Sequence, residues 1–283
     1  MRIVSWNIQW GRGADGIVAL ERTIAVLRAI PDVDVICLQE VAQHFPGLPG
    51  GGDDDGPARL AAAFPGYEAV FGAALDVPGA CGGRACFGNL LLSRLPVGQV
   101  FRHLLPSPPD PAWPSMQRVC VEAVIAAAFG PLRVMTTHLE YYSGLQRAAQ
   151  IQALRAIQQD VAATAQVAPV GKESNPAFAT RPRPVSAVVC GDFNCEPGSS
   201  DHAAMCEALP LAEAGFIDAW QVLHGAAPHP PSVGLHGAEW PDRPYCCDFA
   251  FVSGDIAARV RELRVIADTD ASDHQPLLLD LAD

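Results

Sequence analysis

The chain has 283 residues, 49% of them hydrophobic, and a formal net charge of −12. This length and apolar content suffice for a large buried core, while the acidic balance and the absence of a Lys/Arg cluster argue against a tight, nonspecific binder of nucleic acid. No run approaches the roughly 18 apolar residues of a membrane span, and residues 1–6 enter a strand-like pattern in place of a signal peptide. We therefore expect a globular, monomeric protein of the cytoplasm.

The cysteines predict buried, reduced side chains. Their number, nine, is odd, no CxxC pair occurs, and several lie inside apolar strand-like runs. Such thiols act as small hydrophobic groups in a reducing compartment, whereas a zinc site or a disulfide framework requires a more regular spacing. The residues are Cys37, Cys81, Cys86, Cys120, Cys190, Cys195, Cys206, Cys246 and Cys247.

The chain opens with a β-α-β pattern. Residues 3–8 form an apolar run of strand length, a helical spacing from Ile17 to Leu27 stops at Pro31, and residues 33–38 are typical of a buried strand. Later patterns predict helices at 58–64, 145–161 and 199–209, and strands at 67–72, 85–93, 97–104, 118–129, 132–138, 185–190, 247–252, 260–267 and 277–281.

Hairpin-like neighbours mixed with β-α-β units favour an α/β fold in which helices cover mixed sheets. No internal repeat is visible, and no irregular stretch separates two self-sufficient halves. We therefore expect one domain over residues 1–283, with long surface loops of the kind that carry specificity. These loops lie at 47–57, 105–115, 168–184 and 225–244.

Polar residues stand where several of these strands begin or end. Strand ends and the loops after them gather at one edge of an α/β sheet, which is where ligands bind. Such residues can therefore share one cleft. They are Asn7, Glu40, His138, Asp192, Asn194, Asp248, Asp273 and His274.

Most of these residues also have a structural explanation. Asn7 is a plausible turn former, Glu40 a helix start, His138 a core histidine and Asp192 part of an Asx turn. Asp248 differs, because a carboxylate among cysteines and phenylalanines in a strand is costly to bury unless it is paired.

The mixture of residue types suits phosphoester hydrolysis. Glu40, with help from Asn7, offers oxygen ligands of the kind that Mg²⁺ or Mn²⁺ prefers over zinc. Such a cation neutralises a phosphate oxygen, a histidine adds positive charge at phosphorus, and a carboxylate takes a proton from water. His274 is the natural partner of Asp248.

Seven short motifs follow one another along the chain: SWNIQ at 5–9, LQE at 38–40, GNLLLSR at 88–94, THLE at 137–140, GDFN at 191–194, Asp248 ahead of FVS at 251–253, and SDHQPL at 272–277. In order and spacing they resemble the endonuclease/exonuclease/phosphatase superfamily, which includes pancreatic-type deoxyribonuclease and abasic-site endonucleases. The resemblance runs from Asn7 to Leu277. It implies a four-layer α/β/β/α sandwich of two packed mixed β-sheets with helices on both outer faces.

The resemblance also implies roles for single residues. Glu40 resembles the principal metal ligand, with Asn7 beside it and Asp273 close to the metal. Asp192 resembles the residue that orients or deprotonates the attacking water, and Asn194 resembles an amide that contacts phosphate.

Two histidines complete this implied site. His274 resembles the histidine on the scissile phosphate, Asp248 the carboxylate that holds its imidazole, and His138 a second phosphate-contacting histidine. Arg118 and Tyr141 are candidate substrate contacts. An ordinary strand-end charge and packing against the next helix explain these two equally well.

Two departures from the family pattern stand out. Gln9 replaces an Asp that serves some nuclease branches as a further metal contact, which favours one tight metal site. The segment Cys246–Phe249 replaces the common Arg-Ile-Asp-Tyr, so nearby substrate contacts differ.

The expected activity is a Mg²⁺- or Mn²⁺-dependent phosphodiesterase, in which water attacks phosphorus in line. Its substrate is expected to be a small molecule, a lipid headgroup or a nucleic-acid end. The alternatives are a DNA endonuclease or exonuclease, a phosphomonoesterase, and a non-catalytic binding member of the same fold.

Overall fold

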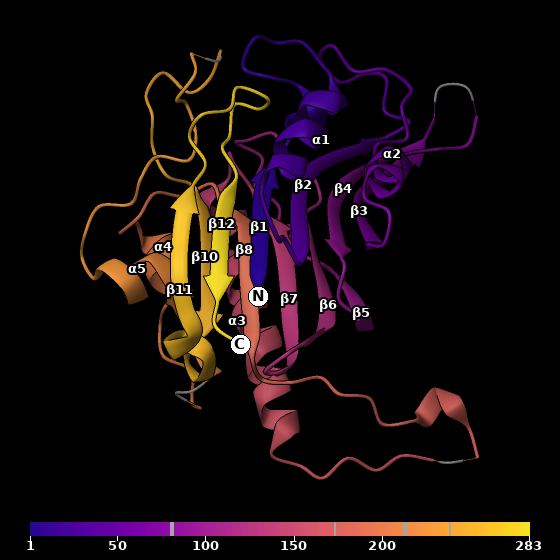
Figure 1. The fold of residues 1–283 in the computed structure, drawn as a ribbon, viewed down its shortest axis with the longest axis vertical. Helices are drawn as coiled ribbons and strands as arrows, with labels where there is room; N and C mark the ends of the chain where they lie inside the picture. Colours follow the sequence, from indigo (N-terminus) through magenta and orange to yellow (C-terminus); the bar gives the residue numbers. More distant parts are fainter. Residues whose placement is uncertain (80–81, 173, 212–213, 238) are drawn as a thin grey trace.

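The computed structural model describes residues 1–79, 82–172, 174–211, 214–237 and 239–283. Two six-stranded mixed β-sheets pack face to face, and helices cover their outer surfaces (Figure 1). The predicted four-layer α/β/β/α sandwich is confirmed. The amino and carboxyl termini lie close together, because Met1 donates a hydrogen bond to the carbonyl of Leu281 over 2.6 Å.

The first sheet has the strand order β11-β12-β1-β2-β4-β3. Its central pair, β1 and β2, is parallel, and the other described neighbours are antiparallel. The strands are β1 (Arg2–Asn7), β2 (Val35–Gln43), β3 (Glu68–Pro78), β4 (Arg84–Ser93), β11 (Val260–Val265) and β12 (Leu277–Leu281).

The second sheet has the order β5-β6-β7-β8-β10-β9. Here β7 and β8 form the parallel pair, flanked by antiparallel neighbours. The strands are β5 (Val97–Leu104), β6 (Val119–Ala127), β7 (Gly130–His138), β8 (Ala187–Asp192), β9 (Phe216–Asp218) and β10 (Asp248–Ser253).

Three apolar cores separate the four layers. Strand alternation sends neighbours such as Ile3 and Val4 to opposite faces, so Ile3 joins the core between the sheets and Val4 the core under α1 and α2. A third core lies between the second sheet and the helices α3 and α4. The helices are α1 (Leu20–Ala29), α2 (Gly56–Ala63), α3 (Gly144–Ala165), α4 (Ser200–Met205) and α5 (Ala219–His224), with short 3₁₀ turns η1 (Gln9–Gly11), η2 (Pro176–Phe178) and η4 (Gly254–Arg259).

Some boundaries differ from those that the sequence predicts. Strand β2 continues to Gln43 because a bulge lets it pair with β4 again from Val41 onward. Helix α4 ends at Met205, although the pattern predicts a helix to residue 209. The elements β9 and α5 were not predicted, since three-residue and six-residue elements are too short for a periodic signal.

The described cysteines are free and mostly buried, as the sequence predicts. Cys81 lies outside the described residues, and the other eight cysteines are free, seven of them buried. Within the described ranges, no helix combines the length and the apolar character that a membrane crossing requires.

Candidate active site

The strand registers bring the predicted polar residues to one edge of the two sheets. Asn7 pairs with Gln39, the neighbour of Glu40, in the first sheet. In the second sheet, Asp192 pairs with His138 on one side and Asp248 on the other. This edge is the upper end of both sheets in Figure 1, where β1 and β2 end.

Local backbone geometry determines the orientation of the Glu40 and Asp192 side chains. Glu40 has a φ of 57° within the bulge of β2, a left-handed conformation that turns its side chain out of the regular alternation. Gly191 has a φ of 146°, and a Cβ there would lie 1.8 Å from the carbonyl oxygen of Thr137. Only glycine therefore allows β8 to approach β7 so closely one residue before Asp192.

Asn7 joins the two carboxylates. Its Nδ2 donates hydrogen bonds to Glu40 Oε1 and to Asp192 Oδ2, each over 3.1 Å. The backbone N–H of Asn194 holds the other Asp192 oxygen, Oδ1, over 2.9 Å. The Asn194 side chain uses one amide hydrogen on the carbonyl of Leu139 over 2.9 Å.

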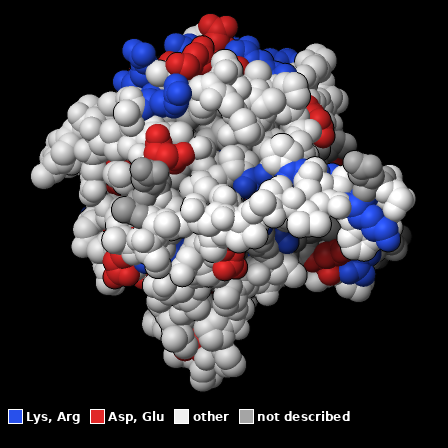
Figure 2. Space-filling view, turned by 90° about the horizontal axis from the view of Figure 1, so that it is seen from below, with Lys and Arg blue, Asp and Glu red and all other residues white. Residues whose placement is uncertain are grey.

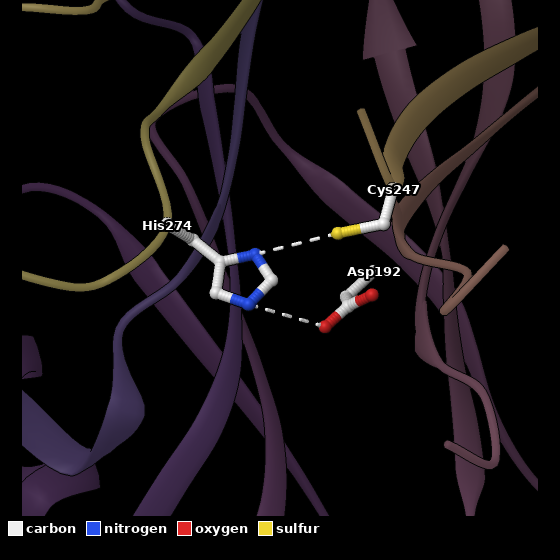
Figure 3. A group of neighbouring side chains, drawn as sticks. All are labelled: Asp192, Cys247 and His274. Carbon is white, nitrogen blue, oxygen red and sulfur yellow. Dashed lines mark hydrogen bonds and ion pairs between the residues drawn. The ribbon is translucent and has the colours of Figure 1, made fainter. Parts of the chain in front are cut away.

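His274 lies between two carboxylates. Its Nδ1 is 2.9 Å from Asp248 Oδ2, the pairing that the sequence predicts, and its Nε2 is 3.6 Å from Asp192 Oδ2. Figure 3 shows one ring nitrogen of His274 facing Asp192 and the other, Nδ1, facing Cys247, whose sulfur lies 4.0 Å from Nδ1. Asp248 Oδ2 also accepts a hydrogen bond from Ser232 Oγ over 2.6 Å.

His138, at the end of β7, faces the carboxylates of Glu40 and Asp192. Its Nδ1 lies 3.7 Å from Glu40 Oε1, and its Nε2 lies 3.6 Å from Asp192 Oδ2. Asp192 Oδ2 is therefore the point at which Asn7 and both histidines converge.

Two acids of the cleft have raised pKa values. Burial and the nearby carboxylate of Asp273 raise the pKa of Glu40 to about 7. Burial likewise raises the pKa of Asp192 to about 6, against the positive charge of His274, which favours the carboxylate.

The two histidines are pushed in opposite directions. Burial opposes the protonated form of His274, but the charges of Asp248 and Asp192 outweigh it and raise the pKa of His274 well above its ordinary value. Burial, followed by the charges of Arg118 and His274, holds the pKa of His138 well below its ordinary value. The imidazole of His274 is thus cationic near pH 7, and that of His138 is neutral.

Asp273 completes a set of oxygen donors. Its Oδ2 accepts a hydrogen bond from Gln9 Nε2 over 2.9 Å, and its Oδ1 accepts one from Ser272 Oγ over 3.1 Å. The carboxylates of Glu40 and Asp273 are oxygen donors of the kind that hard divalent cations prefer, whereas Asn7 turns its Nδ2 toward Glu40 and uses its Oδ1 to accept a hydrogen bond from Gln9 N over 3.1 Å. Burial is the main cause of the raised pKa of Glu40, and a bound cation would relieve the repulsion by Asp273 that adds to it.

These residues line a cleft of about 630 Å³. The cleft contains Glu40, His138, Asp192, Asn194, Asp273 and His274 together with the two candidate substrate contacts, Arg118 and Tyr141. Arg118 Nε donates to Glu140 Oε2 over 3.2 Å, and its buried Nη1 has no hydrogen-bond partner within the described ranges. Asn7 and Asp248 lie behind this surface and contact the residues that form it.

Sequence reasoning missed Ser232, Trp10 and Trp240. Ser232 holds Asp248, and the two tryptophans line the cleft. No motif marks Ser232, because its contact forms only when the loop before β10 returns over the sheet. The signal available for Trp240 was its position in one of the long irregular stretches.

A second group of ionisable residues lies away from the cleft. The Nε2 atoms of His202 and His229 lie 2.9 and 2.7 Å from Asp218 Oδ2. Asp218 Oδ1 accepts a hydrogen bond from Trp220 N at the start of α5. These contacts satisfy the carboxylate and tie the loop around residue 229 to α4 and β9.

The sequence also matches a family model, described as the Endonuclease/Exonuclease/phosphatase family, over residues 4–274. No curated protein sequence matches the chain significantly.

Solved structures share the fold at low identity. An endonuclease/exonuclease/phosphatase from Beutenbergia cavernae is 23% identical, with a TM-score of 0.68 over 100% of this chain and 72% of that one. A 3′ phosphatase from Neisseria bound to a product DNA hairpin is 19% identical, with a TM-score of 0.62 over 100% of both chains. A mannosyl-6-phosphatase from Bacteroides thetaiotaomicron is 15% identical, with a TM-score of 0.65 over 100% of both.

Proposed function

Because the chain belongs to the Endonuclease/Exonuclease/phosphatase family, whose members hydrolyse phosphoesters, we propose that residues 1–283 form one catalytic domain, a Mg²⁺- or Mn²⁺-dependent phosphodiesterase. The observation that carries this proposal is the convergence on Asp192 Oδ2. Asn7 Nδ2 lies 3.1 Å from this oxygen, and the Nε2 atoms of His138 and His274 each lie 3.6 Å from it.

The metal site of this proposal consists of Glu40, with Asn7 and Asp273 beside it. When bound, the cation supplies positive charge for a phosphate oxygen in the transition state. Gln9 holds Asp273 through a neutral amide, which supports a single metal site.

Asp192 orients the attacking water and accepts its proton. Its pKa of about 6 leaves the carboxylate ionised at neutral pH and close to the range in which a general base works best. Asn7 and Asn194 N hold the two oxygens in place, so the base does not reorient during the reaction.

His274, protonated through its contact with Asp248, places positive charge beside the phosphate. His138, neutral, offers a hydrogen bond to a second phosphate oxygen. Arg118 Nη1, which has no partner within the described ranges, is available for the same anion.

Hydrolysis of bis-p-nitrophenyl phosphate and of p-nitrophenyl phosphate, each with EDTA, Mg²⁺ or Mn²⁺, tests the proposal. We expect metal-dependent release from the diester that His274→Ala abolishes. Faster release from the monoester would instead identify a phosphomonoesterase. No release from either ester, combined with no binding of Mg²⁺ or Mn²⁺ by calorimetry, would refute the proposed function.

A further inference from the structure

The acids and histidines of the cleft are flanked by two apolar groups. The Trp10 group consists of Trp10 in η1, Phe45 and Leu48 in the loop after β2, and Phe87 in β4. The rings of Trp10 and Phe45 each lie 6.3 Å from that of Phe87. The Tyr141 group, Tyr141, Tyr142 and Trp240, is carried by loops of the second sheet. Its rings are in contact, with centroids 4.7 Å apart for Tyr141 and Tyr142 and 5.3 Å for Tyr141 and Trp240.

The Tyr141 group is held open to solvent beside the reacting centre. Tyr141 is 39% exposed, Tyr142 51% and Trp240 36%. Contiguous exposed aromatic surface next to convergent polar groups is the usual sign of a binding site, because ligand burial recovers the hydrophobic free energy that the exposed rings forgo. In Figure 1 the long loop that carries Trp240 rises above the ends of β10 and β12, at the same end of the molecule as the site.

The cleft has few positive charges to offer. Among the described residues that line it, the cationic types are Arg118, His138 and His274, and Arg118 is paired with Glu140. Beyond the cleft lining, Arg12 is paired with Glu239, and Arg243, which lies over the ring of Tyr245, is paired with Glu196. A polyanion needs several phosphate-neutralising contacts, so these walls suit one phosphate and an uncharged group beside it.

Resting on the proposed function, we propose that the substrate is a phosphoester with an apolar group on the phosphate, seated between the Trp10 group and the Tyr141 group. The phosphate lies at Asp192 and His274, and the apolar group extends along the aromatic walls. A cleft of about 630 Å³ lies within the range of roughly 300–1,000 Å³ for small-molecule sites. Either an aromatic ring or an alkyl chain can serve as this apolar group.

A series of p-nitrophenyl phosphodiesters tests the inference, because the leaving group stays constant while the second ester group is methyl, butyl, phenyl or thymidine 5′. The readout is kcat/KM with Mg²⁺ or Mn²⁺, divided by the uncatalysed rate of each ester. Each buried CH₂ contributes about fourfold, so we expect the butyl or the phenyl ester to exceed the methyl ester at least about tenfold. A butyl preference identifies an alkyl chain, and a phenyl or thymidine preference identifies a ring.

Trp240→Ala and Tyr141→Ala are expected to reduce the ratio of apolar to methyl ester to about a third or less, since each removes part of one wall. The matched control is Trp113→Ala, because Trp113 is a tryptophan with 54% exposure that does not line the cleft. Circular dichroism checks that each variant is folded.

The outcomes separate the two proposals. Equal kcat/KM across the series, in an enzyme that hydrolyses the methyl ester, overturns the inference and leaves the proposed function intact. An apolar preference that survives both wall variants overturns the assignment of the Tyr141 group. If no ester is hydrolysed and calorimetry detects no binding of Mg²⁺ or Mn²⁺, the proposed function fails and the inference falls with it.

Discussion

Asp192 and His274 act on each other's charge at the centre of the cleft. Together with the larger effect of Asp248, the carboxylate of Asp192 raises the pKa of the His274 imidazole, and the imidazolium opposes the rise in the pKa of Asp192 that burial causes. In the proposed mechanism, the pair therefore combines a general base with a positive charge in a site of low dielectric, where electrostatic stabilisation of a transition state is strongest.

Substituting either residue is expected to lower kcat without unfolding the protein. We expect Asp192→Asn and His274→Ala to lower kcat by about 10²–10⁴-fold. Because burial disfavours the charged form of Asp192, the metal-free Asp192→Asn protein should melt at the same temperature as wild type or higher at pH 8. Steady-state kinetics and calorimetry test this, and near-wild-type turnover in either variant would contradict the assigned roles.

Glu40→Gln should weaken the response to metal. The amide removes the negative charge of the proposed principal ligand, so we expect the Mg²⁺ concentration for half-maximal activity to rise at least about tenfold. Metal titration of activity and calorimetric metal binding measure this independently. Glu68→Gln, an exposed position on β3, is the matched control, and an unchanged metal requirement in Glu40→Gln would refute its role as a ligand.

At the scale of elements, a buried ion network joins β5, β6 and β7. The carboxylate of Glu122 lies 3.0 Å from His103 Nε2 and accepts hydrogen bonds from Arg133 over 3.0 Å and Arg183 over 2.8 and 2.9 Å. Arg183 also covers the ring of Phe101 at 3.9 Å. The network thereby fastens the end of the long loop before β8 to the edge of the second sheet.

Glu122→Gln should destabilise the protein at neutral pH. Burial opposes ionisation of Glu122, but His103, Arg183 and Arg133 outweigh it and lower its pKa to about 2. The folded pKa lies below the unfolded value of about 4.5, so the stabilisation is complete above pH 4.5 and is lost as the pH falls toward 2.

We expect the substitution to cost about 3 kcal/mol at pH 7, and the difference from wild type to shrink below pH 4.5. Urea unfolding at several pH values measures both. Glu262→Gln, which removes an exposed partner of Arg264, should cost under about 1 kcal/mol. A pH-independent difference for Glu122→Gln would contradict this account.

At the scale of the whole molecule, the net charge of −12 disfavours long nucleic acids as partners. Figure 2 shows the end opposite the cleft, where Lys and Arg occur in small groups interspersed with Asp and Glu. The arginines that flank the cleft are likewise paired with acids.

Duplex DNA is therefore expected to bind weakly and with little dependence on salt. Each neutralised phosphate contributes about −0.9 to the slope of log K against log salt. For the Asp192→Asn protein and a short duplex, we expect a slope no steeper than about −3. Fluorescence anisotropy between about 50 and 200 mM salt measures this slope, and a slope near about −6 would support a nuclease that contacts several DNA phosphates.

Local patterns were sufficient for the framework of the fold and for most candidate site residues. The long helix α3 has apolar residues at helical spacing, the buried strands are continuous apolar runs, and polar residues directly after such runs mark strand ends. Asn7, Glu40, His138 and Asp192 could be grouped on that ground because strand ends in an α/β fold meet at one edge. The motif order then indicated the family that the model match confirms.

Contacts between distant segments were beyond the reach of those patterns. Ser232 reaches Asp248, Arg183 reaches Glu122, and Tyr141 meets Trp240 only after long loops return over the sheets. Such contacts leave no periodic trace in the chain, because loop conformation depends on what the loop packs against. The residues of the proposed reacting centre could therefore be grouped from local sequence, whereas the apolar walls on either side of them emerged only when the two sheets were packed together.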